Sequence, residues 1–368
     1  MNGARKIMIS LAFGGLAACQ PAPVHKPLPA HQVAAPTPPP APPVVSAPPP
    51  PVISAPAPDP VAPDARIIET ATPGPPAEKG HFDPAIVRLE VLLDRAGFSP
   101  GVIDGREGTN LQRAEAAYAG VHRLNAPDLP GAILQSLTAA DRGPVTEVYV
   151  TTAADTAGPF IGPVPTNYEV MARLPALAYS DPEQLLAAKF HMGRKLLEAL
   201  NPGVNFANPG TRLLVAAVRP SLRAYAAAKV VVDKTLGQVR AYDRQGNLVA
   251  LYPATVGSTE RPAPSGVFAV KAVARNPIYF YDPRRLTFTP SGAKGELRIA
   301  PGPNNPVGTT WIALTIPTYG IHGSPEPEAI GKRQSHGCVR LTNWDAAELG
   351  GAVKKGVEVD FVGRERAS

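Results

Sequence analysis

The stretch Ser335-His336-Gly337-Cys338-Val339-Arg340, with His322-Gly323 upstream of it, lies near the C-terminal end of this 368-residue chain. Short segments of strand-type composition, separated by Gly and Pro turns, precede and follow both motifs. Thr342 and Asp345 fit a capping box, which predicts a helix that begins near Asn343. The strand candidates cover residues 229–233, 238–243, 247–256, 267–274, 310–316 and 357–361. Many short strands with one good late helix predict a mostly β domain over residues 227–363.

Cys338 is the residue of this stretch whose chemistry suits a nucleophile. A free cysteine titrates near pH 8.5, so it needs a nearby base to form thiolate at neutral pH, and His322 and His336 are candidates for that base. Gly337 allows a sharp turn or a close approach of substrate. On these residues alone, two other interpretations stay open. Cys338 could be a small buried hydrophobic side chain, or His322, His336 and Cys338 could hold a zinc ion together with water.

Taken together, these two motifs resemble the signature of the L,D-transpeptidases, bacterial cell-wall cross-linking enzymes with a YkuD-like catalytic domain. The turns Pro264-Ser265-Gly266-Val267-Phe268 and Asn305-Pro306-Val307-Gly308 are similar to recurrent turns of that family. The resemblance covers residues 227–363. It implies a β-sandwich-like catalytic domain with one or two short helices, and neither a metal ion nor a cofactor.

The resemblance also implies a role for each residue of the signature. Cys338 is expected to be the nucleophile and His322 the general base and acid. The Gly323 carbonyl or the Ser324 hydroxyl is expected to orient the imidazole. Arg340 is expected to hold a substrate carboxylate. The acyl site is expected to be lined by Ser335, His336 and the backbone N–H groups of Gly337 and Cys338, which would serve as oxyanion donors.

The reaction implied by the resemblance is acyl transfer between peptidoglycan stem peptides. Cys338 would attack the carbonyl that follows the third residue of a tetrapeptide stem, release D-alanine and form a thioester. An amine of another stem, or of an envelope protein, would resolve that thioester. Two other function classes stay open. One is an L,D-carboxypeptidase or amidase that passes the same thioester to water, and the other is a non-catalytic peptidoglycan-binding lipoprotein.

The N-terminus has the pattern of a secretory signal. Arg5 and Lys6 precede an apolar run over residues 7–18, which is too short to span a bilayer because a span needs roughly 20 helical residues. The run ends in Leu16-Ala17-Ala18-Cys19, which resembles a bacterial lipobox whose cysteine is acylated. This predicts a lipid-anchored protein of the periplasm, and Gln20, which is not acidic, favours the outer membrane. An ordinary signal peptide cut nearby is the alternative.

Residues 20–79 are predicted to be a disordered linker. The whole chain contains 46 prolines, and proline runs at 38–40 and 48–51 favour extended polyproline II. Proline donates no backbone hydrogen bond and fixes φ, so this segment is expected to form neither helix nor sheet. At ~3.1 Å per residue it would act as a long spacer between a membrane anchor and a catalytic head.

Two small modules are predicted between this linker and the β domain. Residues 80–140 show a helical apolar stripe that stops at Gly97, and they resemble the small helical peptidoglycan-binding domain of cell-wall enzymes. Residues 175–219 combine a helix opened by Asp181-Pro182-Glu183 with a short strand, and they resemble a lysin-motif-related α+β module. Both resemblances make glycan an expected partner. His191 is interpreted as a surface or turn residue without a chemical role.

Composition excludes several classes of protein. The net charge of +6 is mild and scattered, whereas a nucleic-acid-binding protein shows a basic stripe, so no nucleic-acid partner is expected. The chain has two cysteines, Cys19 and Cys338, which excludes a disulfide scaffold and a four-cysteine zinc site. If Cys19 is lipidated, Cys338 is the one thiol that remains free.

Overall fold

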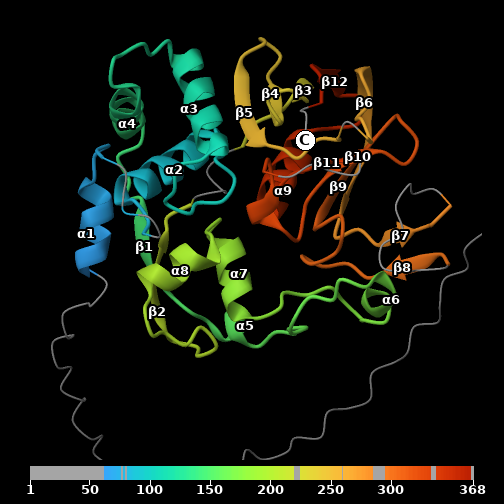
Figure 1. Cartoon of the computed structure of the whole chain (residues 1–368), viewed down its shortest axis with the longest axis horizontal. Coiled ribbons are helices and arrows are strands. Elements are labelled where there is room, and N and C mark those ends of the chain that lie inside the picture. The colour runs from blue at the N-terminus through green and yellow to red at the C-terminus, as the bar shows by residue number, and fades with distance from the viewer. Residues whose placement is uncertain are drawn as a thin grey trace, which may run out of the picture. The chain divides into compact units, whose positions relative to one another are not determined.

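The computed structural model describes residues 62–75, 78, 81–218, 224–258, 260–284, 295–332 and 337–365. The signal segment with Cys19, most of the predicted linker, and Ser335 and His336 lie outside these residues. The described chain comprises a helical region up to residue 218 and a mostly β domain from residue 224 onward. Figure 1 colours the first from blue to lime and the second from yellow to red.

Local capping signals define the helices of the first part of the helical region. For one of them, Asp83 accepts a hydrogen bond from Ala85 N at 2.8 Å, and Gly97 closes the helix with φ 87°. A left-handed residue of this kind favours glycine at a helix end, so the predicted stop at Gly97 is confirmed. The helices are α1 (Ala62–Thr70), α2 (Pro84–Ala96), α3 (Thr109–His122) and α4 (Leu129–Ala140).

α1 corrects the predicted linker, because it lies inside residues 20–79. Ile68 is 1% exposed and belongs to the core of the helical region. Glu69 Oε1 accepts hydrogen bonds from Val145 N and Thr146 N, each at 2.8 Å. Burial and this anchor hold a helix in the proline-free stretch 64–72. The prediction followed the proline content of the whole segment and therefore extended the linker too far.

The second part of the helical region begins and ends with a strand. These two strands pair antiparallel, with Thr146 opposite Ala216. Its elements are β1 (Thr146–Val150), α5 (Ala153–Thr156), α6 (Tyr168–Met171), α7 (Pro182–Lys189), α8 (Arg194–Leu200) and β2 (Arg212–Ala216). β1 lies upstream of residue 175, so the partner of β2 is outside the range predicted for the second module. Buried residues of α2, α3, α4, α7, α8 and β2 form one core. The two predicted modules therefore share a single core.

The mostly β domain predicted from the strand pattern is confirmed. One mixed sheet runs in the order β11-β10-β9-β6-β12-β3-β4-β5. Its strands are β3 (Lys229–Asp233), β4 (Gln238–Tyr242), β5 (Leu248–Pro253), β6 (Gly266–Arg275), β9 (Thr310–Leu314), β10 (Gly320–His322), β11 (Val339–Arg340) and β12 (Glu358–Val362). β7 (Tyr279–Tyr281) and β8 (Leu297–Ile299) form a separate hairpin.

The helix predicted to follow the C-terminal motif is present as α9 (Asn343–Ala352). The Thr342 hydroxyl accepts a hydrogen bond from Asp345 N at 3.1 Å, which confirms the predicted start. Ala346 and Leu349 of α9 are buried in the core of the β domain. A short 3-10 turn, η2 (Pro327–Ala329), lies between β10 and β11.

Strand β6 joins two halves of the sheet and accounts for the sandwich-like shape. Its first half pairs with β12, from Gly266 to Ala269, and its second half pairs with β9, from Val270 to Arg275. A bulge between Val270 and Ala272 interrupts the register at the start of the pairing with β9. A β-bulge bends the strand and increases its twist, so the two halves curl around a common core.

The helical region and the β domain are in direct contact. Ser99 N donates to Leu251 O at 2.9 Å and Leu251 N donates to Gly97 O at 2.8 Å, which extends the sheet beyond β5. In the turn after α7, His191 has φ 55° and stacks on Trp344 of α9 with ring centroids 4.9 Å apart. The predicted turn position of His191 is confirmed, but a surface position is wrong because the side chain is buried at this contact.

Candidate active site

The pairing of β10 with β11 brings the predicted catalytic residues together. The two strands are parallel, with Ile321 opposite Val339 and His322 opposite Arg340. Ile321 and Val339 are buried in the core of the β domain. Because successive residues of a strand point to opposite faces, His322 and Arg340 belong to the other face. Cys338 directly precedes β11. The predicted base, nucleophile and cation are therefore close together, since the charge of Arg340 acts on both His322 and Cys338.

His322 is buried and its tautomer is defined by one hydrogen bond. Nδ1 lies 2.7 Å from the carbonyl oxygen of Gly323, and a carbonyl can only accept, so Nδ1 carries the proton and Nε2 keeps a lone pair. The indole of Trp311 stacks on the imidazole with centroids 5.4 Å apart. Burial, and then the charge of Arg340, lower the pKa of His322 to about 3. The imidazole is therefore neutral at physiological pH, as a general base must be.

The Cys338 thiol lies beside Gly320 of β10. Burial raises the pKa of this thiol above its ordinary value, although a hydrogen bond from the Gly320 backbone and the charge of Arg340 both act to lower it. A Cβ atom at Gly320 would lie 2.7 Å from Ile312 O and 2.8 Å from the Trp311 ring, so a larger residue does not fit there. The site therefore contains a neutral thiol and a neutral imidazole.

The remaining predicted residues occupy different positions. Gly337 has φ 126°, which favours glycine, and its carbonyl accepts a hydrogen bond from the Tyr319 hydroxyl. Ser324 is buried and its Oγ accepts from Glu326 N at 3.1 Å. The Gly323 carbonyl, rather than the Ser324 hydroxyl, is thus the group on the imidazole. Ser335 and His336 lie outside the described residues.

Three tyrosines that pack together, two of them within reach of the charge of Arg340, were not predicted. The ring of Tyr168 meets Tyr281 edge-on at 5.4 Å and Tyr279 at 5.9 Å. Burial raises the pKa of Tyr168 and of Tyr279, and the charge of Arg340 acts on both phenols in the opposite direction. Cys338 also lies close enough to Tyr279 to raise its pKa. The spacing of Tyr279 and Tyr281, two residues apart, could have indicated that they share one face of a strand. Nothing in the sequence around Tyr168 points to the site.

A cavity of about 580 Å³ adjoins the site on the side of Ser324. It lies between α7 and α8 on one side and the β domain on the other, and its lining includes Gln184, Arg194, Asn304 and Trp344. Ser324 follows His322, the last residue of β10, by two positions, so one wall of this cavity lies close in the chain to that strand. Its volume is in the range of roughly 300–1,000 Å³ that small-molecule sites occupy.

The described ranges contain neither a cluster of metal ligands nor a membrane-spanning helix. No group of three or more His, Cys, Asp or Glu side chains in them is arranged to hold a metal ion. That statement does not extend to His336, one of the ligands of the zinc interpretation, because it lies outside those ranges. The same part of the chain contains no helix of the length and apolar character that crossing a membrane requires.

Comparison with known proteins gave matches in one enzyme family. The YkuD family, described as the L,D-transpeptidase catalytic domain, matches residues 227–360. A Bacillus licheniformis protein that carries the name L,D-transpeptidase YkuD is 31% identical over 179 residues, which are 48% of this chain and 90% of that protein. Escherichia coli K12 YbiS, also named as an L,D-transpeptidase, is 29% identical over 188 residues, or 50% of this chain and 60% of YbiS.

Among solved structures, L,D-transpeptidase 3 of Mycobacterium tuberculosis in complex with a faropenem-derived adduct is 21% identical to this chain. The alignment covers 36% of this chain and 59% of that one, with a TM-score of 0.30. The match to the YkuD family covers residues 227–360, which lie inside the range 227–363 predicted for the catalytic domain.

Proposed function

Because this chain belongs to the L,D-transpeptidase family, we propose that Cys338 forms a thioester with a peptidoglycan tetrapeptide stem and transfers the acyl group to an amine. One observation supports this proposal: the β10–β11 register pairs His322 with Arg340, and Cys338 directly precedes β11. Each of the three has the chemistry that one part of the reaction requires. The substrate class follows from the family.

The first half of the reaction acylates the enzyme. Cys338 Sγ attacks the carbonyl carbon between the third stem residue and the terminal D-alanine, while His322 Nε2 takes the thiol proton. The charge that develops on the carbonyl oxygen is stabilised by backbone N–H donors of Gly337 and Cys338. The C–N bond then breaks, and D-alanine leaves with the proton from His322. Arg340 holds a carboxylate of the donor stem. The neutral imidazole supports this proton transfer.

The second half returns the thiol. An amine attacks the thioester carbon, and His322 Nε2 takes a proton from that amine. The Cys338 sulfur leaves as the new amide forms and receives this proton from His322. The cavity lined by Ser324, close in the chain to His322, supports transfer, since its volume of about 580 Å³ offers room for part of a second peptide. If water attacks in place of the amine, the same residues make the protein an L,D-carboxypeptidase or amidase.

Intact mass spectrometry tests the proposed reaction. The mature chain is incubated with a tetrapeptide stem, alone and with an acceptor amine, and Cys338→Ser serves as the control. The expected result is a tripeptide-sized adduct on Cys338 that passes to the amine. An adduct cleared equally fast by water alone would assign hydrolysis. Absence of any adduct would overturn the enzymatic proposal and leave a binding protein.

We also infer that the protein is anchored through a lipid on Cys19 and works in the periplasm, with the outer membrane as its expected site. The lipobox-like end of the signal segment supports this inference, and two or three acyl chains are enough for stable anchoring. Cys19→Ala is expected to move the protein from the membrane fraction to the soluble periplasm while acylation of Cys338 persists. Continued membrane retention of this variant would contradict the anchor.

A further inference from the structure

A segment outside the matched family region lies against the site. The family match begins at residue 227, whereas Tyr168 opens α6 in the helical region. Asn167 caps this short helix, because its Oδ1 accepts hydrogen bonds from Glu169 N at 2.7 Å and Val170 N at 3.3 Å. The cap fixes the direction in which the chain enters α6, and with it the position of Tyr168.

This segment is attached to the β7–β8 hairpin by a small core of its own. Met171 and Leu177 are buried together with Ile299 of β8, and Figure 1 shows α6 next to that hairpin. The Leu177 carbonyl accepts a hydrogen bond from Asn304 N at 2.9 Å. A Cβ at Gly302 would lie 2.1 Å from the same carbonyl, so glycine permits this close approach of two backbones.

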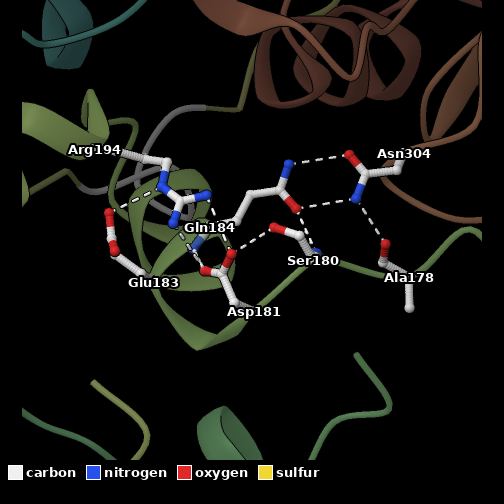
Figure 2. Close-up of polar contacts among 7 residues, drawn as sticks. All are labelled: Ala178, Ser180, Asp181, Glu183, Gln184, Arg194 and Asn304. Atoms are coloured by element: carbon white, nitrogen blue, oxygen red, sulfur yellow. Dashed lines mark hydrogen bonds and ion pairs between the residues drawn. The ribbon is translucent and has the colours of Figure 1, made fainter. Parts of the chain in front are cut away.

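Two side-chain amides hold the other end of the segment (Figure 2). Gln184 Nε2 donates to Asn304 Oδ1 at 3.0 Å, and Asn304 Nδ2 donates to Gln184 Oε1 at 2.9 Å and to the Ala178 carbonyl at 2.7 Å. Asn304 is 1% exposed, so these hydrogen bonds are shielded from water. Tyr168 is therefore held against the β domain from both sides, by the small core and by this amide pair.

The hydroxyl of Tyr281 has an unmet hydrogen-bond requirement. The side chain is 1% exposed, and the hydroxyl has no hydrogen-bond partner among the residues that the structure describes. A buried donor without a partner is destabilising. Tyr281 packs against the ring of Tyr168, and the charge of Arg340 acts on Tyr168 and Tyr279. This arrangement indicates a polar ligand that enters between these side chains.

We propose that Tyr168 completes the donor-stem site, where its hydroxyl and Arg340 bind one carboxylate of the stem. The identity of this ligand rests on the proposed function. The chemistry is complementary, because a carboxylate accepts hydrogen bonds and is attracted by the guanidinium, and charge-assisted hydrogen bonds of this kind are strong. The site so formed selects donors with a free carboxylate. It takes one wall from a segment that lies outside the catalytic domain.

Binding in the absence of chemistry tests this proposal. Tetrapeptide stems are titrated into the full-length Cys338→Ala protein and into Cys338→Ala with Tyr168→Phe, by calorimetry. Loss of one hydrogen bond to a charged group is expected to weaken binding about tenfold. Two further stems carry a carboxamide in place of a carboxylate, one at the third residue and one at D-alanine. On one of these two stems, Tyr168→Phe is expected to weaken binding by less than about threefold, since the charged acceptor is gone.

Tyr149→Phe in the Cys338→Ala protein is the matched control. It removes a phenol hydroxyl of the same helical region, which donates to Asp155 at 2.6 Å, and it is expected to leave stem binding unchanged. Equal binding with and without Tyr168→Phe overturns the proposal. If Tyr168→Phe weakens binding of both carboxamide stems about tenfold, the proposal is also overturned, because a displaced β7–β8 hairpin would then be the cause. If the Cys338→Ala protein binds none of the stems, the proposal is overturned as well.

The two proposals fail in different ways. If the Cys338→Ala protein binds stems as expected but wild type forms no adduct, the proposed reaction fails and the Tyr168 site stands. If wild type is acylated normally and Tyr168→Phe changes nothing, the Tyr168 site fails and the reaction stands.

Discussion

The helical region and the β domain differ in the sequence separation of the contacts that define each of them. In the helical region, caps next to each helix define its ends, such as Asp83 and Gly97 for α2 and Asp181 for α7. In the β domain, the site depends on strands that are distant in sequence, since β6 pairs with both β12 and β9 and β10 pairs with β11. Local signals therefore define the elements of one region, and strand register creates the site of the other.

The largest expected effect is confined to the β domain. Cys338→Ser is expected to abolish thioester formation, with a loss of at least about 10³-fold in acylation rate, because an alkoxide forms far less readily than a thiolate. The thermal unfolding midpoint is expected to stay within about 2 °C, since one sulfur atom is replaced by oxygen. Rate is measured by mass spectrometry of the adduct. Full activity in this variant would remove Cys338 from the mechanism.

Replacing the base is expected to have the next largest effect. His322→Asn removes the neutral imidazole and is expected to lower the acylation rate about 10²–10⁴-fold, the usual contribution of a general base. The matched control is His122→Asn, at an exposed residue at the end of α3, which is expected to acylate at the wild-type rate. A His322→Asn rate within about threefold of wild type would assign the base to another group.

His322 also predicts a pH dependence of stability. The pKa of His322 is about 3 in the folded protein and about 6.5 in an unfolded chain, so between these values the unfolded state binds more protons. The free energy of unfolding is therefore expected to fall as the pH is lowered from about 6.5 towards 3. Urea titrations at pH 7 and pH 5 should show a smaller fall for His322→Asn than for His122→Asn. Equal falls would contradict the buried, neutral state of His322.

A core substitution in the helical region is expected to lower stability without changing the acylation rate of the folded protein. Leu197 of α8 is 0% exposed and shares its core with α2. Leu197→Ala is expected to lower the free energy of unfolding by about 2–5 kcal/mol, whereas Val121→Ala at an exposed position of α3 is expected to change it by less than about 0.5 kcal/mol. Acylation per folded molecule is expected to stay unchanged in both variants. Equal stability of the two variants would contradict the shared core.

The sequence predicted those elements whose signals are local. The strand Lys229–Asp233 and the capped start of α9 match the structure residue for residue. β10 and β11 were not predicted, because strands of three and two residues are too short to show an alternating pattern. α1 was missed because prolines on both sides dominate the composition of its neighbourhood.

The candidate site shows the same division. The motif residues Cys338, His322 and Arg340 could be named from the sequence, because they lie within one short stretch and resemble a family signature. Tyr168 could not be named, since it meets Tyr279 and Tyr281 only through tertiary packing. The depressed pKa of His322 follows from burial, which no residue pattern around a single histidine specifies.

The smallest expected effect concerns the thiol itself. Arg340 lowers the pKa of Cys338 while burial raises it more strongly, so removal of the charge in Arg340→Gln is expected to raise that pKa further. Alkylation by iodoacetamide, followed from pH 7 to pH 10, should then have a higher midpoint and be a few-fold slower at pH 8. Arg340→Lys is the matched control, since it keeps the positive charge and is expected to shift the midpoint less. A midpoint that is the same in wild type, Arg340→Gln and Arg340→Lys would mean that Arg340 does not act on the thiol, and its role would then be confined to binding substrate.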